Sequence, residues 1–251
     1  MKKSFTINEK GNSIRCLMYY ADIKAVRRAV ICAHGFGGNK DNKSAERFSD
    51  YVLKKHKDIV VITYDAPAHG EDVKRKLMLE DCFEYIKIVT AYVKSRFKTD
   101  EIYIYANSFG AYQYLNYIYE NGNSYRKLAL RCPAVNMYDI ISAKITSPDD
   151  IKALSRNKPI LVGFDHNVKI DNKFIEKLKE TDVFARDFKK FSEDIIFIHG
   201  TKDSIVDFDL SKKFADENNI KFVAVEGADH IFKDPKKMDT AIKEIVEFFG
   251  F

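Results

Sequence analysis

The stretch Tyr105-Ala106-Asn107-Ser108-Phe109-Gly110-Ala111 joins an apolar run at 102–106 to an amphipathic segment at 109–120. The run predicts a buried strand and the segment predicts a helix. A serine in a tight turn between two such elements presents its hydroxyl at the edge of a sheet, and the residues two positions before and after it must be small. Ala106 and Gly110 meet this requirement, although glycine is usual at both places. Taken alone, the stretch also fits a serine that caps the helix.

Strands and helices alternate along the chain on both sides of this turn. Short apolar runs predict strands at 28–33, 59–64, 102–106, 127–132, 195–199 and 221–225, and helical periodicity predicts helices at 44–55, 79–97, 109–120, 207–217 and 236–249. The alternation predicts the α/β class, with helices on both faces of a mainly parallel sheet of about eight strands. Two further strands at 5–7 and 14–20, joined by a turn at Lys10-Gly11-Asn12, predict an antiparallel N-terminal edge.

One interval, 133–193, interrupts this alternation with 61 residues. A crossover between parallel strands needs only about a dozen. Within the interval, 160–162 and 168–170 predict a hairpin, Asp171 caps a helix at 172–180, and Asp182 caps another that runs to Phe191. We therefore expect a core made of 1–132 and 194–251, with 133–193 inserted as a small cap. The cap is expected over the carboxyl edge of the sheet, where ligands of open parallel sheets bind.

Composition excludes several other classes of protein. The chain has 251 residues, of which 45% are hydrophobic and 31% are charged, and this excludes a disordered or fibrous protein. Its net charge of +5 is spread among interspersed charges of both signs, so no nucleic-acid partner is expected. No secretory leader and no apolar run long enough to span a membrane are found, which predicts a cytoplasmic protein. The cysteines are expected to be buried free thiols: Cys16, Cys32, Cys82 and Cys132.

Two further residues complete a pattern with Ser108. A serine hydroxyl needs a base to become a nucleophile, and the base needs a carboxylate that orients and stabilises it. Asp203 follows the predicted strand 195–199, and His230 follows the predicted strand 221–225. All three residues therefore lie in loops at the carboxyl edge of the sheet, in the order serine, aspartate, histidine. We expect Ser108, Asp203 and His230 to be catalytic.

A glycine-rich stretch, His34-Gly35-Phe36-Gly37-Gly38, follows the strand at 28–33. Glycines let backbone amides approach a ligand closely. The main-chain N–H groups of Phe36 and Phe109 are therefore candidates for an oxyanion hole, which stabilises the negative charge that develops on an attacked carbonyl oxygen. The stretch matches neither of the glycine patterns that bind phosphates or dinucleotides.

These residues resemble the α/β-hydrolase family, within its esterase, lipase and aminopeptidase-like branch. The resemblance extends from about residue 5 onward and includes Asp65-Ala66-Pro67-Ala68-His69-Gly70, in which Ala68 replaces a family glycine. It implies that Ser108 is the nucleophile, that His230 is the general base and then acid, and that Asp203 orients it. It also implies an oxyanion hole at Phe36 and Phe109. The glycine-rich stretch and the hairpin-bearing cap are similar to small intracellular carboxylesterases, including cinnamoyl and feruloyl esterases.

The expected activity is hydrolysis of a small carboxylic ester through an acyl-enzyme, with no cofactor and no metal. An acyltransferase or an aminopeptidase with the same three residues is the alternative, and the latter would need an acidic group near the cap, such as Asp139, Asp165 or Asp171. A non-catalytic ligand-binding protein is a further alternative. The residues expected to contact substrate are Gly35, Met137, Tyr138 and Phe164. The sequence does not indicate the oligomeric state.

Overall fold

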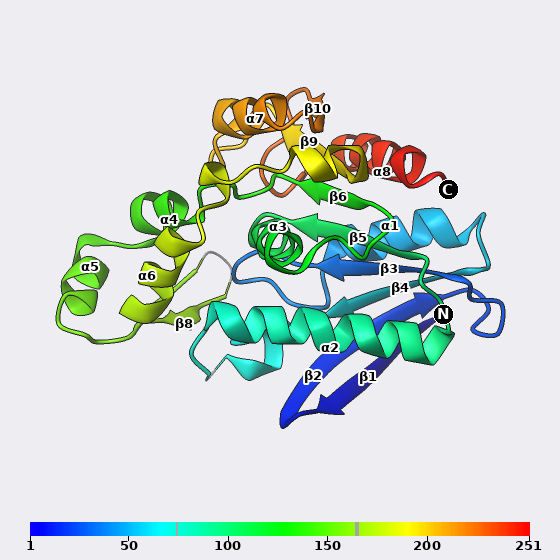
Figure 1. The fold of residues 1–251 in the computed structure, drawn as a ribbon, viewed down its shortest axis with the longest axis horizontal. Coiled ribbons are helices and arrows are strands. Elements are labelled where there is room, and N and C mark those ends of the chain that lie inside the picture. The colour runs from blue at the N-terminus through cyan, green and yellow to red at the C-terminus, as the bar shows by residue number, and fades with distance from the viewer. Residues whose placement is uncertain (74, 164–165) are drawn as a thin grey trace.

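The computed structural model describes residues 1–73, 75–163 and 166–251. An eight-stranded sheet in the order β1-β2-β4-β3-β5-β6-β9-β10 forms its centre (Figure 1). Its strands are β1 (Lys2–Glu9), β2 (Asn12–Tyr20), β3 (Arg28–Ala33), β4 (Ile59–Tyr64), β5 (Ile102–Asn107), β6 (Leu128–Arg131), β9 (Ile195–Gly200) and β10 (Lys221–Val225). The pairs β1–β2 and β2–β4 are antiparallel and all the others are parallel. The predicted fold class is confirmed.

Helices cover both faces of this sheet. In Figure 1, α2 and α3 lie on one face and α1 and α8 on the other. The helices outside the interval 133–193 are α1 (Lys43–Leu53), α2 (Leu79–Phe97), α3 (Phe109–Asn121), α7 (Phe208–Glu217) and α8 (Pro235–Phe249), together with a 3-10 helix, η1 (Gly70–Asp72). The hydrophobic core accordingly divides into two clusters, one for each face of the sheet.

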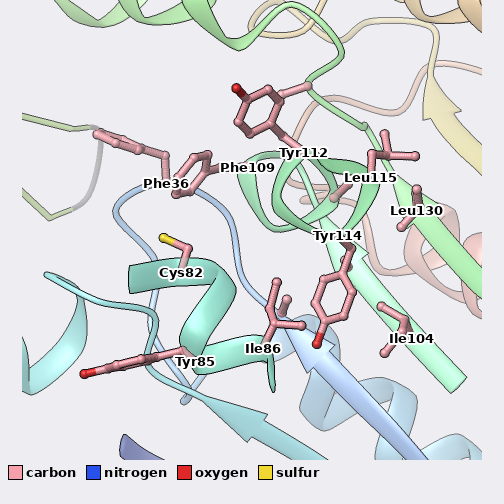
Figure 2. Packing of buried hydrophobic residues seen from close by; sticks show 14 of the residues in the cluster. Phe36, Cys82, Tyr85, Ile86, Ile104, Phe109, Tyr112, Tyr114, Leu115 and Leu130 are labelled. Atoms are coloured by element: carbon pink, nitrogen blue, oxygen red, sulfur yellow. The ribbon is translucent and has the colours of Figure 1, made fainter. Parts of the chain in front are cut away.

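The burial of strand β5 explains why its sequence is apolar without alternation. All six of its residues are buried. Ile104 and Ala106 belong to the cluster under α2 and α3, whereas Tyr103 and Tyr105 belong to the cluster under α1 and α8. Figure 2 shows Ile104 on the first of these faces, near Tyr114 and Leu130. A strand buried on both faces needs apolar side chains on both, and this makes its sequence a continuous apolar run.

The inserted segment, residues 133–193, lies beyond the ends to which β3, β5 and β6 point (Figure 1). Its hairpin of β7 (Ile160–Val162) and β8 (Val168–Ile170) and its helix α6 (Asn172–Glu180), capped by Asp171, confirm the predicted elements. The sequence did not predict its first helices, α4 (Met137–Ile140), the π-helix η2 (Ile141–Ile145) and α5 (Pro148–Leu154). Among the described residues, no helix is long and apolar enough to cross a membrane.

The predicted single helix from Asp182 to Phe191 is wrong. Asp182 caps only one 3-10 turn, η3 (Val183–Ala185), and a second 3-10 helix, η4 (Lys189–Asp194), follows separately. The backbone between them is extended at Arg186, whose guanidinium reaches Asn116 on α3 at 2.8 Å. Two residues later the Phe188 amide donates to the Asn218 side chain at 2.6 Å. These tertiary contacts override the local helical pattern.

Three contacts tie the inserted segment to the rest of the molecule. The Leu77 amide donates to the Lys169 carbonyl at 2.8 Å. Lys76 forms an ion pair of 2.5 Å with Asp171, the residue that caps α6. The Tyr112 hydroxyl on α3 is 2.6 Å from the hydroxyl of Thr181 at the end of α6. Helix α6 is therefore anchored at both ends, and the hairpin is anchored through β8.

Candidate active site

Ser108 occupies a strained turn between β5 and α3. Its φ of 50° and ψ of −115° lie in a region that side-chain-bearing residues rarely adopt. Such a conformation costs about 1–3 kcal/mol and persists only where the surroundings enforce it. Here the Ser108 amide donates to the Arg131 carbonyl at 3.0 Å, and the Ser108 carbonyl accepts from the Tyr112 amide at 3.1 Å. The side chain is partly exposed, as predicted for a serine displayed at the sheet edge.

The small residues around Ser108 have the expected reason. A Cβ atom placed on Gly110 would lie 2.6 Å from the His34 carbonyl oxygen and 2.9 Å from the Ala33 carbonyl oxygen. Strand β3 and helix α3 therefore come too close for any side chain at this position. Ala106, the departure from the usual glycine, is fully buried in the core. The core thus accommodates one methyl group there.

We expect Gly110→Ala to lower the free energy of unfolding by about 2 kcal/mol or more, because the new methyl group must displace backbone rather than a flexible side chain. Denaturant titration measures the change. The control is Asn121→Ala, at the exposed end of the same helix, which should change stability by less than about 0.5 kcal/mol. A Gly110→Ala protein as stable as the parent would contradict the close approach of α3 to β3.

Asp203 and His230 form a hydrogen-bonded pair. His230 Nδ1 donates to Asp203 Oδ2 at 2.8 Å, and the side chains are 16% and 0% exposed respectively. The other carboxylate oxygen, Oδ1, accepts the amides of Ile205 and Val206, both at 2.9 Å. With its proton held on Nδ1, the imidazole keeps a free lone pair on Nε2. That nitrogen can accept a proton from a hydroxyl group.

The loops that carry these two residues are bound to each other. The Lys202 amide donates to the Ala228 carbonyl at 2.9 Å, and the Gly227 amide donates to the Thr201 hydroxyl at 2.8 Å. A Cβ atom on Gly200 would lie only 2.3 Å from the Ala228 carbonyl oxygen. Glycine at the end of β9 therefore allows the two loops to pack directly against each other. The aspartate and the histidine are thus held by backbone contacts as well as by their own hydrogen bond.

His199 is a second imidazole on Asp203 that the sequence analysis did not single out. It is fully buried on β9, and its Nε2 lies 3.1 Å from Asp203 Oδ2 and 3.3 Å from the Val206 carbonyl. Because a carbonyl can only accept, Nε2 carries the proton and donates to both oxygens. Burial acts to raise the pKa of Asp203, but the hydrogen bonds from His199 and His230 outweigh it and hold the pKa well below its ordinary value. The carboxylate therefore stays ionised.

Cys132 lies beside this pair. Its sulfur and the ligand atoms of Asp203 and His230 all lie within 4.8 Å of one another, and they form the one cluster of potential metal ligands found among the described residues. Burial, reinforced by the negative charge of Asp203, raises the pKa of the Cys132 thiol far above its ordinary value. A protonated thiol is neither a nucleophile nor a metal ligand. The chemistry of this donor set fits the aspartate–histidine pair better than a resident ion.

The predicted oxyanion loop is oriented by His34. The Ala66 amide donates to His34 Nε2 at 3.0 Å, so the ring proton sits on Nδ1, which donates to the Gly35 carbonyl at 2.8 Å. Burial lowers the pKa of His34, which favours this neutral form. In a planar trans peptide the N–H points away from the preceding C=O. The Phe36 N–H therefore faces away from His34.

The second predicted donor, Phe109, is the first residue of α3, where an amide has no partner inside the helix. Gly35 lies against the serine: a Cβ atom placed on it would be 3.3 Å from Ser108 Cβ and 3.8 Å from Ser108 Oγ. The peptide between Gly35 and Phe36 therefore borders Ser108. Phe109 directly follows Ser108 in the chain, and Phe36 directly follows Gly35, so their role as oxyanion-hole donors stays a prediction.

Aromatic rings line this part of the molecule. The rings of Phe36 and Phe109 lie edge to face with centroids 5.7 Å apart, and Figure 2 shows the two side chains together. Phe174 on α6 packs against Phe109 at 6.2 Å, so the inserted segment contacts the same aromatic group. Among the predicted substrate contacts, Met137 is buried in the core, Tyr138 is partly buried beneath the Lys179 ammonium group, and Phe164 lies outside the described residues.

The last contact that a serine–histidine–aspartate site needs is a hydrogen bond between the Ser108 hydroxyl and His230. The hydrogen bonds among the described residues include none from Ser108 Oγ. The turn and the histidine loop are nevertheless joined through β6. Arg131 accepts the Ser108 amide on its own carbonyl, and its guanidinium donates to the His230 carbonyl at 3.0 Å. Hydrogen bonds to a catalytic base are often long in unliganded enzymes and shorten when substrate binds.

Comparison with known proteins gives the same family that the motifs indicated. The family described as "Serine aminopeptidase, S33" matches residues 24–232. No curated protein matches the chain by sequence. Among solved structures, Est1E from Butyrivibrio proteoclasticus with bound ferulic acid is similar with a TM-score of 0.75 and 16% identity, over 98% of this chain and 100% of that one.

Two other solved structures are similar to the same degree. A putative hydrolase from Agrobacterium vitis has a TM-score of 0.76 and 15% identity over 99% of this chain and 98% of that one. A monoglyceride lipase from Saccharomyces cerevisiae has a TM-score of 0.76 and 15% identity over 100% of this chain and 94% of that one. At such identities these likenesses establish the fold, whereas the family match covers most of the sequence. The chain therefore belongs to the α/β-hydrolase family of serine hydrolases.

Proposed function

We propose that this protein hydrolyses carboxylic esters through an acyl-enzyme on Ser108. The observation that carries the proposal is the Asp203–His230 pair, in which a carboxylate with no exposed surface accepts the Nδ1 proton of a partly exposed imidazole. The same molecule holds Ser108 in a strained turn, and the amides of Phe36 and Phe109 are the candidate oxyanion-hole donors. Similar structures include Est1E with bound ferulic acid and a monoglyceride lipase in complex with a substrate analogue. The proposed reaction uses only these protein groups and water, and it requires no cofactor.

In the proposed reaction, Ser108 Oγ attacks the ester carbonyl carbon while its proton passes to His230 Nε2. The carbonyl oxygen becomes an oxyanion that accepts hydrogen bonds from the Phe36 and Phe109 amides, each worth about 3–4 kcal/mol in the transition state. His230 then gives its proton to the departing alcohol, which leaves an acyl-enzyme. A water molecule loses a proton to His230 and attacks the acyl carbon, and the returning proton restores the Ser108 hydroxyl as the acid is released. Asp203 stabilises the imidazolium in both steps.

We further propose that the inserted segment, residues 133–193, acts as a cap on a core made of 1–132 and 194–251. Its helix α6 brings Phe174 onto Phe109, next to the proposed oxyanion hole. This arrangement places aromatic side chains next to the position proposed for the reacting carbonyl. It favours substrates with an aromatic or medium-length aliphatic acyl group, for which apolar contact is the main source of binding free energy.

An aminopeptidase is the second candidate, because the matching family carries that description. Such an enzyme needs an acidic group for the substrate's free amine. Asp171 is already engaged by the α6 cap and by Lys76, and Asp165 lies outside the described residues. The exposed Asp139 on α4 remains. Burial of Asp182 is the main cause that raises the pKa of Asp182, and the negative charge of Asp139 raises it further. These two carboxyl groups would have to bind the amine.

A substrate comparison separates the candidates. We expect a fluorophosphonate probe to label Ser108. We also expect kcat/KM for p-nitrophenyl esters of graded chain length and for aryl cinnamates to exceed kcat/KM for aminoacyl p-nitroanilides by at least about a hundredfold. Faster turnover of the anilides would favour the aminopeptidase, and acyl transfer to an added alcohol in place of hydrolysis would favour an acyltransferase. A folded protein that neither reacts with the probe nor turns over any ester would contradict the proposal and favour a non-catalytic ligand-binding protein.

A further inference from the structure

Arg131 is the last residue of β6 and is only 6% exposed, although arginine is rarely so buried. Its Nε donates to Asn107 Oδ1 at 3.0 Å, and its Nη1 donates to the His230 main-chain carbonyl at 3.0 Å. Asn107 directly precedes Ser108 in the chain. One rigid guanidinium group thus contacts both the segment that carries the proposed nucleophile and the segment that carries the proposed base.

The surroundings of this cation are unusual. Both of its hydrogen-bond acceptors are neutral oxygens, and none of the ion pairs formed among the described residues includes it. A buried charge without a counter-ion carries a desolvation cost that an apolar side chain of similar length would not carry. The guanidinium carbon also lies 4.8 Å from the ring centroid of Phe232, whose backbone φ is 55°. The arginine therefore holds a strained part of the histidine loop as well as His230 itself.

The other end of this connection is fixed by α1. Asn107 Nδ2 donates to Ser44 Oγ at 3.2 Å, and the Ser44 hydroxyl donates to Asn42 Oδ1 at 2.9 Å. Asn42 is the N-cap of α1 and accepts the Ala45 amide. Asn107 is therefore oriented from the helix side, so its carbonyl oxygen presents a fixed acceptor to Arg131. The chain of contacts runs without interruption from α1 to the His230 loop.

We propose that Arg131 is a positioning residue that sets the distance between the His230 loop and the Ser108 turn. The role rests on the proposed serine hydrolase chemistry. Asp203 fixes the rotation of the His230 ring through Nδ1, but among the described residues it forms no hydrogen bond with the Ser108 turn. Arg131 contacts both, and a misplacement of about 1 Å between reacting groups can lower a rate by about a hundredfold. The hydrogen bonds of Arg131 should therefore set the position of His230 and leave the affinity for substrate unchanged.

Steady-state kinetics of Arg131→Met with a p-nitrophenyl ester tests this role. We expect kcat to fall by about 10- to 100-fold while KM stays within about threefold. The reason is that the variant displaces the base without altering the side chains proposed to contact the acyl part of the substrate. Arg131→Lys keeps the positive charge, but its single side-chain nitrogen cannot bridge Asn107 Oδ1 and the His230 carbonyl as the guanidinium group does. This variant should therefore recover only part of the parent kcat. The matched control is Arg126→Met, an exposed arginine just before β6, which should retain full activity.

The same substitution in a His230→Ala background distinguishes positioning from general damage. Without the base, the residual turnover depends on binding and on the oxyanion hole, so Arg131→Met should lower it by no more than about twofold. An equal fall in both backgrounds, or an Arg131→Met enzyme with unchanged kcat, would overturn the proposal. If Arg131→Met does not fold, Arg131→Lys is compared in the same two backgrounds. Undiminished turnover by Ser108→Ala would instead refute the proposed function itself.

Discussion

Ser108→Ala is expected to lower kcat/KM for ester substrates by about 10⁵-fold or more, because loss of the nucleophile removes the whole covalent pathway at once. The amides of Phe36 and Phe109 are untouched, so a small residual rate above that of water should remain. The melting temperature should change by no more than about 2 °C, because alanine keeps the Cβ atom and the substituted oxygen makes no hydrogen bond among the described residues. Steady-state kinetics and thermal denaturation of the same preparation measure both quantities.

Two companion variants make this result specific. Ser204→Ala removes an exposed hydroxyl next to Asp203 and should keep full activity. Ser108→Gly should be equally inactive but more stable than Ser108→Ala by about 1 kcal/mol, since glycine adopts a positive φ without the steric cost that Cβ adds. An active Ser108→Ala enzyme would show that another residue is the nucleophile. Equal stability of the alanine and glycine variants would contradict the strained turn.

The features that could be predicted from the sequence are those set by local pattern. Continuous apolar runs identified the strands buried on both faces, and the spacing of small residues around Ser108 identified the tight turn, which the close approach of Gly110 to β3 explains. The chain order placed Asp203 and His230 after adjacent strands, and β9 and β10 are indeed paired. Loops that follow neighbouring parallel strands meet at one edge of the sheet, so their proximity follows from topology alone.

The features that escaped prediction depend on contacts that the spacing of apolar residues does not indicate. Arg131 gives no local signal, because its partners Asn107 and His230 are 24 and 99 residues away. His199 is the next-to-last residue of β9, and the fold of the loop that follows brings the carboxylate of Asp203, four residues later, to its Nε2. The helix predicted after Asp182 failed for the same reason, since the α3 surface and Asn218 draw the chain out of helical geometry. Local periodicity records none of these interactions.

Asp203→Asn is expected to lower kcat by about 10⁴-fold, although the two side chains have the same shape. Oδ1 of Asp203 accepts two backbone amides, from Ile205 and Val206. In the variant the amide oxygen must keep that place, because an NH₂ group there would face two donors. The NH₂ group then replaces Oδ2 and donates to His230 Nδ1. This forces the imidazole proton onto Nε2, where it blocks acceptance of the Ser108 proton.

The matched control for this substitution is Asp207→Asn. Asp207 is the exposed N-cap of α7, and asparagine caps helices as well as aspartate, so neither activity nor stability should change measurably. Single-turnover acylation with an activated ester shows whether the loss in Asp203→Asn lies in the first chemical step. An Asp203→Asn enzyme that keeps more than about a tenth of the parent kcat would show that His230 does not depend on Asp203 for its tautomer.

Acid denaturation gives a second, independent readout of the same carboxylate. Because the pKa of Asp203 is lower in the folded state than in the unfolded chain, its ionisation stabilises the fold above the unfolded value of about 4, and this contribution is lost as the pH falls toward the folded value. The asparagine variant carries no such contribution and also faces the Nε2–H of His199 with a second donor. We therefore expect the parent to be more stable at pH 7 and the difference to narrow below about pH 4. A difference that does not change with pH would mean that neither histidine stabilises the charged form of Asp203.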